Sequence, residues 1–115
     1  MKYMIQMYGN ITRDEFAAMS EDEQKEMYAD WGAISQTPGV TPAPYELDDP
    51  ANATTIRVQD GRTLVTDGPF AQTKEALGGW MLYEADDLDA AIELASRIPT
   101  ARMGGAIEVR PVVER

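Results

Sequence analysis

The residues best suited to chemistry lie within residues 60–79, around an Asp-Gly-Pro-Phe motif that begins at Asp67. A carboxylate can act as a general base or anchor a ligand, and burial at the edge of an apolar face would raise the pKa of Asp67. The same carboxylate could instead accept backbone N–H bonds and hold the turn at Gly68 and Pro69. Asp67 is therefore the candidate catalytic residue, and a purely structural role is the alternative.

Five other side chains are candidates for ligand binding. Lys74 could pair with an anionic ligand, although a solvated lysine is the simpler interpretation. Tyr8 and Trp80 suit a core or an interface, and they could also form the walls of a pocket for a flat apolar ligand. The full set of ligand-binding candidates is Tyr8, Phe70, Thr73, Lys74 and Trp80. No EF-hand or Walker spacing is present, so the sequence predicts neither a metal site nor a cofactor.

The amino-acid composition excludes several classes of function. The 115 residues include no histidine, which excludes Ser-His-Asp and Cys-His nucleophiles and histidine-ligated metal sites. The formal net charge is −10 and the basic residues are scattered, which argues against binding to nucleic acid. Cysteine is absent, no apolar run has membrane-spanning length, and no signal-peptide pattern begins the chain. We therefore expect a cytoplasmic protein with neither a membrane nor a nucleic-acid partner.

Patterns of apolar residues predict the elements that must position these side chains. Strands are predicted over Lys2–Tyr8, Thr54–Gln59, Arg62–Asp67, residues 79–85 and residues 107–113. Capping boxes at Thr12 and Ser20 predict a short helical turn over residues 12–19 and a helix over residues 21–34. The buried stripe of that helix is expected to be Met27, Trp31 and Ile34. Asp86 or Asp87 begins a third helix, which Pro99 ends and whose expected stripe is Leu88, Ala91, Ile92, Ala95 and Ile98.

The segment of residues 36–53 is rich in proline, with prolines at positions 38, 42, 44 and 50. Proline interrupts regular backbone hydrogen bonding, so a long loop is expected here. A loop of this length in a small domain is usually functional or mobile. Tyr45 is its one large aromatic residue, and it could close over a pocket or pin the loop to the surface.

The two strands at Thr54–Gln59 and Arg62–Asp67 are predicted to form a hairpin. Asp60-Gly61 favours a two-residue type I′ turn, because both positions of that turn need a positive φ. The turn sets a register in which Val58 faces Thr63, Ile56 faces Val65, and Thr54 faces Asp67. Asp67 should therefore lie on the apolar face of the hairpin, at its far edge.

The order of elements predicts one α+β domain over residues 1–115. With the strand at Thr54–Gln59 set aside as an insertion, the order is β-α-β-β-α-β, a ferredoxin-like arrangement. Its two main helices can cover one face of a four-stranded sheet. The strands at Lys2–Tyr8 and residues 79–85 carry large apolar side chains on both faces, so the second face also needs a cover. We therefore predict a homodimer that packs sheet on sheet about a two-fold axis.

Several motifs resemble the DGPF family, a branch of the YCII-related proteins. The segments that carry the resemblance are Thr54-Thr55-Ile56-Arg57-Val58, Asp60-Gly61-Arg62, Thr66-Asp67-Gly68-Pro69-Phe70, Thr73-Lys74-Glu75, Leu77-Gly78-Gly79, Asp87-Leu88-Asp89-Ala90-Ala91 and Ile107-Glu108-Val109-Arg110-Pro111-Val112. The resemblance implies a dimeric α+β barrel. YCII-like relatives are suspected enzymes with a proposed Asp-His pair. Asp67 corresponds to that aspartate, and the histidine has no counterpart in this chain.

Two hypotheses about function stay open at this point. In the first, the chain is a homodimer that binds a small molecule in a cleft between sheet and helices. The cleft would be lined by Tyr8, Phe70 and Trp80, and Asp67 would be its polar group. If Asp67 transferred a proton to or from the ligand, the protein would be an enzyme. In the second, the chain is a non-enzymatic accessory or regulatory module. The resemblance supports this alternative, because DGPF relatives often occur beside extracytoplasmic-function sigma factors.

Overall fold

The computed structural model describes residues 1–9, 11–71 and 75–115. The elements follow in the order β1 Lys2–Tyr8, α1 Arg13–Ala18, α2 Glu21–Ser35, β2 Val40–Glu46, the 3-10 turn η1 Pro50–Asn52, β3 Thr54–Gln59, β4 Arg62–Asp67, β5 Leu77–Glu84, α3 Leu88–Ser96, α4 Pro99–Arg102 and β6 Ala106–Pro111. The predicted combination of helices with antiparallel strands is confirmed, and the chain is of the α+β class.

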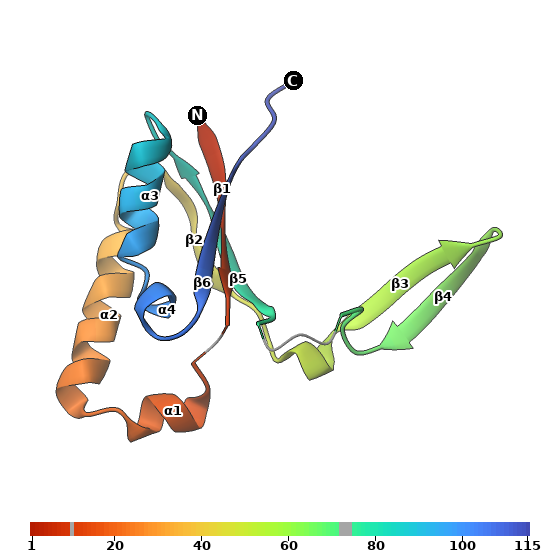
Figure 1. Ribbon diagram of the computed structural model, residues 1–115, viewed down its shortest axis with the longest axis horizontal. Helices are drawn as coiled ribbons and strands as arrows, with labels where there is room; N and C mark the ends of the chain where they lie inside the picture. Colours follow the sequence, from red (N-terminus) through yellow and green to blue (C-terminus); the bar gives the residue numbers. More distant parts are fainter. Residues whose placement is uncertain (10, 72–74) are drawn as a thin grey trace.

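Four of the described strands form an antiparallel sheet in the order β2-β5-β1-β6, and the helices α2, α3 and α4 lie on one side of it (Figure 1). Side chains alternate between the two faces of a strand, so every second residue of β1 points toward the helices. Ile5 is completely buried there, opposite Met81 of β5 and Val109 of β6. The main core cluster consists of Ile5, Met7, Ile34, Met81, Leu94 and Ile98.

Helices α1, α2 and α3 begin at the predicted caps. The Ser20 hydroxyl accepts a hydrogen bond from the Glu23 N–H at 3.1 Å, and the Glu23 carboxylate accepts one from the Ser20 N–H at 3.2 Å. This reciprocal capping box satisfies two backbone donors that the first turn of α2 leaves unpaired. At the start of α3, the Asp87 carboxylate accepts from the Ala90 N–H at 2.9 Å.

The predicted stripe of α3 needs two corrections. Leu94 is completely buried although the prediction left it out, whereas Leu88 is 48% and Ile92 is 50% exposed. The buried stripe is therefore centred on Ala91, Leu94, Ala95 and Ile98. The prediction that Pro99 stops this helix is confirmed, because Ile98, the residue before the proline, already has an extended backbone. α3 ends at Ser96, and Pro99 is the first residue of α4, a position that suits proline because its missing N–H would be unpaired there.

The predicted loop over residues 36–53 contains a strand. β2 pairs with β5 at the edge of the sheet, with Val40 opposite Tyr83 and Glu46 opposite Gly79. Proline lacks a backbone donor, so it is tolerated in a strand that needs hydrogen bonds on one side only. The register shifts between Thr41 and Tyr45, where the prolines at positions 42 and 44 lie. The prolines therefore led to the prediction of a loop, although the segment forms a strand at the edge of the sheet.

Strands β3 and β4 form a separate two-stranded sheet, called the arm here (residues 54–67). The predicted register is confirmed, with Val58 opposite Thr63 and Ile56 opposite Val65. The turn has the positive φ values expected, 53° at Asp60 and 76° at Gly61. However, the predicted order β-α-β-β-α-β counted β4 as a strand of the main sheet, and this assignment is wrong. The strand that follows the first helices in the main sheet is β2, and β4 pairs only with β3.

The arm extends away from the sheet on the side opposite the helices (Figure 1). It raises the radius of gyration to 16.3 Å, whereas a compact domain of this length has a radius of about 13 Å. The apolar face of the arm meets solvent, since Ile56 is 61%, Val58 is 68% and Val65 is 63% exposed. The face that was expected to join a core is therefore uncovered in the single chain.

The side of the sheet away from the helices, called the open face, is also apolar. Met4 of β1 lies opposite Leu82 of β5, and both are half-buried. Tyr45 of β2 lies opposite Trp80, and the two rings contact each other with their centroids 5.2 Å apart. The prediction that the strands are apolar on both faces is confirmed, and within the described chain no helix covers this second face.

Candidate functional site

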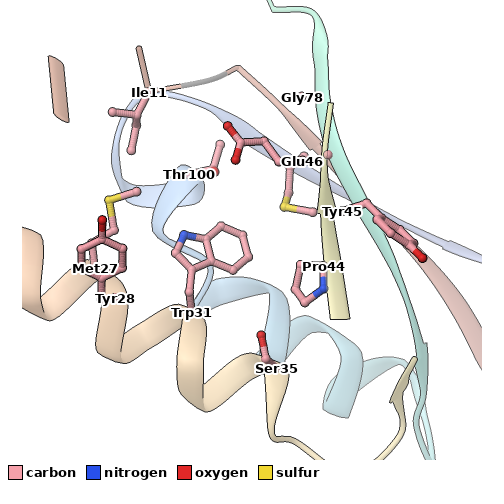
Figure 2. Close-up of a pocket in the computed structure, with 12 residues that line it drawn as sticks. Ile11, Met27, Tyr28, Trp31, Ser35, Pro44, Tyr45, Glu46, Gly78 and Thr100 are labelled. Atoms are coloured by element: carbon pink, nitrogen blue, oxygen red, sulfur yellow. The ribbon is translucent and has the colours of Figure 1, made fainter. Parts of the chain in front are cut away.

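A pocket of about 330 Å³ lies between α2 and the β2–β5 edge of the sheet, and is called the α2–β2 pocket here (Figure 2). It is on the helix-covered side of the sheet. The lining residues are Met7, Ile11, Met27, Tyr28, Trp31, Ser35, Pro44, Tyr45, Glu46, Gly78, Gly79 and Thr100. Most of this surface is apolar, as is typical of small-molecule sites.

One stripe of α2 forms a wall of the pocket. Met27, Trp31 and Ser35 are spaced four residues apart, so they follow each other along one side of the helix. The indole of Trp31 rises from the helix into the middle of the pocket (Figure 2). Thr100 of α4 reaches the same space, and α4 is tied to α2 by the Arg102–Asp30 ion pair at 2.6 Å. The helical wall is therefore positioned by contacts outside the pocket itself.

The opposite wall comes from the last residues of β2 and the first of β5. Alternation along β2 directs the Glu46 carboxylate into the pocket and turns the Tyr45 ring away from it (Figure 2). Glu46 lies opposite Gly79, where an added Cβ would stand 2.5 Å from the Tyr45 carbonyl oxygen and 3.4 Å from Met7 Cε. Only glycine fits that approach, and its missing side chain leaves room beneath Glu46.

Glu46 is the single charged residue among the described lining residues. No ion pair or hydrogen bond engages its carboxylate within the described part of the chain. The hydroxyls of Tyr28, Ser35 and Thr100 and the indole N–H of Trp31 are the other polar side-chain groups of the described lining. The pocket can therefore accept an apolar body and offer one negative charge with a few hydroxyls beside it.

Asp67 lies at the base of the arm, and its side chain is exposed. Within the described residues its carboxylate accepts no backbone hydrogen bond. The turn after it is held by other groups. The Gly68 N–H donates to the Ala53 carbonyl at 2.7 Å, and the Thr55 hydroxyl donates to the Gly68 carbonyl at 2.8 Å. In the single chain, Asp67 thus has neither the burial nor the bonding on which its two predicted roles depend.

The comparisons with known proteins give a family. The YCII-related domain matches residues 1–115, the whole of the chain. The chain belongs to the YCII-related family. An uncharacterised protein of Rhizobium meliloti (strain 1021) is 34% identical over 100 residues, which cover 84% of this chain and 81% of that protein.

In this YCII-related chain, the predicted site residues that the structure describes lie apart from the α2–β2 pocket. Trp80 and Tyr8 belong to β5 and β1, and Trp80 packs against Tyr45 on the open face. Phe70 is 78% exposed. Thr73 and Lys74 lie outside the described residues. None of the described candidates lines the pocket.

The sequence carried partial signals for the pocket of this YCII-related chain. Met27 and Trp31 were on the predicted stripe of α2, but an apolar stripe does not distinguish a packed core from a pocket wall. Glu46 lies in a segment that was expected to be a loop, so the sequence predicted no strand partner for it and no position beside the pocket. In the described residues, no three carboxylates converge on a metal position, and no helix is both long and apolar enough to cross a membrane.

Proposed function

We propose that this YCII-related protein is a homodimer in which each protomer binds a small, largely apolar molecule in the α2–β2 pocket. The observation that carries the binding part is the pocket itself, an apolar hollow with Trp31 at its centre and one carboxylate, Glu46, directed into it. Its volume of about 330 Å³ is at the small end of the range for ligand sites. A small metabolite therefore suits it better than an extended ligand.

The dimer is supported by the amount of apolar surface that a single chain leaves uncovered. The chain exposes 8258 Å², whereas a compact monomer of this mass exposes about 6,200 Å². The excess comes with an arm whose apolar face meets solvent, and an isolated two-stranded hairpin is at best marginally stable in water. A second copy offers a matching apolar surface, the open face around Met4, Trp80 and Leu82.

A two-fold arrangement would cover both surfaces at once, because each arm could pack on the partner while the two open faces meet. Such a dimer would be the α+β barrel of the DGPF branch, which the motif from Asp67 to Phe70 favours. The α2–β2 pocket is on the other side of the sheet, so dimerisation would leave it accessible.

The binding part can be tested by filling the pocket. Ser35→Trp places a large ring at the end of the α2 stripe, and Ala33→Trp places the same ring at an exposed position of α2 that does not line the pocket. The probe is phenethyl alcohol, detected by saturation-transfer NMR. We expect the unmodified protein and Ala33→Trp to bind the probe and Ser35→Trp to lose it. Equal binding by all three proteins would contradict the proposal.

A further inference from the structure

We infer that the α2–β2 pocket selects an organic cation, a small amine with an apolar or aromatic body. This inference rests on the proposed function, since it names the class of ligand for the same pocket. The starting observation is electrostatic: the described lining contains one carboxylate and no cationic side chain. Among the described lining residues, no cationic side chain would balance the repulsion between a bound anion and Glu46. A bound cation would instead supply a partner for the carboxylate, which no described side chain pairs with.

The arrangement of the lining supports a cation with an attached apolar body. Trp31 presents its ring system to the same space that the Glu46 carboxylate and Thr100 enter (Figure 2). Tryptophan is the best of the aromatic side chains for binding a cation over its face. An ammonium group could therefore lie between the Trp31 ring and Glu46 and donate to the Thr100 hydroxyl. The thioethers of Met7 and Met27 would pack against the rest of the ligand.

The charge of the whole chain acts in the same direction but less specifically. A net charge of −10 attracts any cation toward the surface. A test must therefore separate the contribution of Glu46 from that of the general field. Glu26→Gln is the matched control, because Glu26 is an exposed residue of α2 outside the lining and its loss changes the net charge by the same amount as Glu46→Gln.

The test compares three probes of similar shape: phenethylamine, phenethyl alcohol and hydrocinnamate, which are cationic, neutral and anionic at neutral pH. Dissociation constants are measured by calorimetry on the full chain. We expect the amine to bind about tenfold more tightly than the alcohol, and hydrocinnamate to bind most weakly, because opposite charges a few ångströms apart near a surface interact on this scale. The preference should fall as salt is added, which can be measured without any substitution.

The variants locate the origin of this preference. In Glu46→Gln most of the preference for the amine should be lost, leaving only the smaller contribution of the Trp31 ring and of the general charge, and in Glu26→Gln the tenfold preference should persist. If the unmodified protein binds the alcohol as tightly as the amine, the inference is wrong while the pocket remains a small-molecule site. Binding of none of the three probes would overturn both the inference and the proposed function. A tenfold preference that persists undiminished in Glu46→Gln would also overturn the inference, because Glu46 would then not be its cause.

Discussion

The two faces of the four-stranded sheet carry similar apolar side chains but differ in how far these side chains are buried. On the helix side, Ile5 and Met81 are completely buried, and the chain supplies its own cover. On the open face, Met4 and Leu82 are only half-buried, and the arm beyond them exposes Val58 to 68%. Apolar residues on both faces thus indicate that both need a cover. They do not indicate whether the cover comes from the same chain, and that difference is what the following predictions address.

The largest effect should separate two neighbours on β1 that point to opposite faces. Ile5→Ala should lower the free energy of unfolding by about 2–5 kcal/mol, because it leaves a cavity in the core. The loss should not depend on protein concentration. Met4→Ala should cost less, and its loss should shrink as the protein is diluted, because the partner that would bury its side chain then dissociates. Urea unfolding at two protein concentrations measures both.

An equal and concentration-independent loss for Ile5→Ala and Met4→Ala would break the comparison. It would mean that the open face gains no cover when two chains meet.

A second prediction tests the glycine that shapes the α2–β2 pocket. Gly79→Ala should destabilise the protein by about 1–3 kcal/mol, because its Cβ would clash with β2 and the structure must shift. The clash is with the Tyr45 carbonyl oxygen, at 2.5 Å. Gly32→Ala is the control, because an added Cβ at that position of α2 meets nothing within 4 Å. It should stabilise the helix by about 0.5–1 kcal/mol.

Opposite signs for the two glycine substitutions in urea unfolding would support the close approach of β2 to β5. Stabilisation by both would show that β2 does not pack against Gly79.

The smallest effect is expected at Asp67. Asp67→Ala should change the free energy of unfolding by less than about 0.5 kcal/mol, because its exposed carboxylate makes no hydrogen bond among the described residues. Asp87→Ala, which removes the cap of α3, should cost about 1 kcal/mol. Binding of phenethyl alcohol should be unchanged in both variants. Loss of binding in Asp67→Ala alone would instead support the hypothesis that Asp67 belongs to the ligand site.

Local signals predicted the elements of this fold well. The caps at Ser20 and Asp87 and the Asp60-Gly61 turn depend on a few neighbouring residues, so the sequence contains the whole of each signal. β2 was missed because its place at the edge of the sheet, which makes proline acceptable, depends on β5 more than thirty residues away. The position of the arm was missed for a related reason. Its register is determined by the neighbouring residues of the turn, but its separation from the main sheet depends on residues that are distant in the sequence.

The candidate site was less predictable than the fold. Glu46 becomes a pocket residue only because β2 pairs with β5 opposite Gly79 and because Trp31 of α2 lies across from it. Neither of these two relations is visible in the spacing of the residues. Asp67 attracted notice because its motif is distinctive, and a distinctive motif can equally mark a turn at the base of an arm.

The claim that the open face and the arm bind a second copy is tested most directly by sedimentation velocity at micromolar concentration. Val58→Lys places a charge on the apolar face of the arm, and Gln59→Lys places the same charge on the adjacent residue, which points to the opposite face. We predict a dimer for the unmodified chain and for Gln59→Lys, and a folded monomer for Val58→Lys. A monomeric unmodified chain, or a Val58→Lys variant that stays fully dimeric, would contradict the claim.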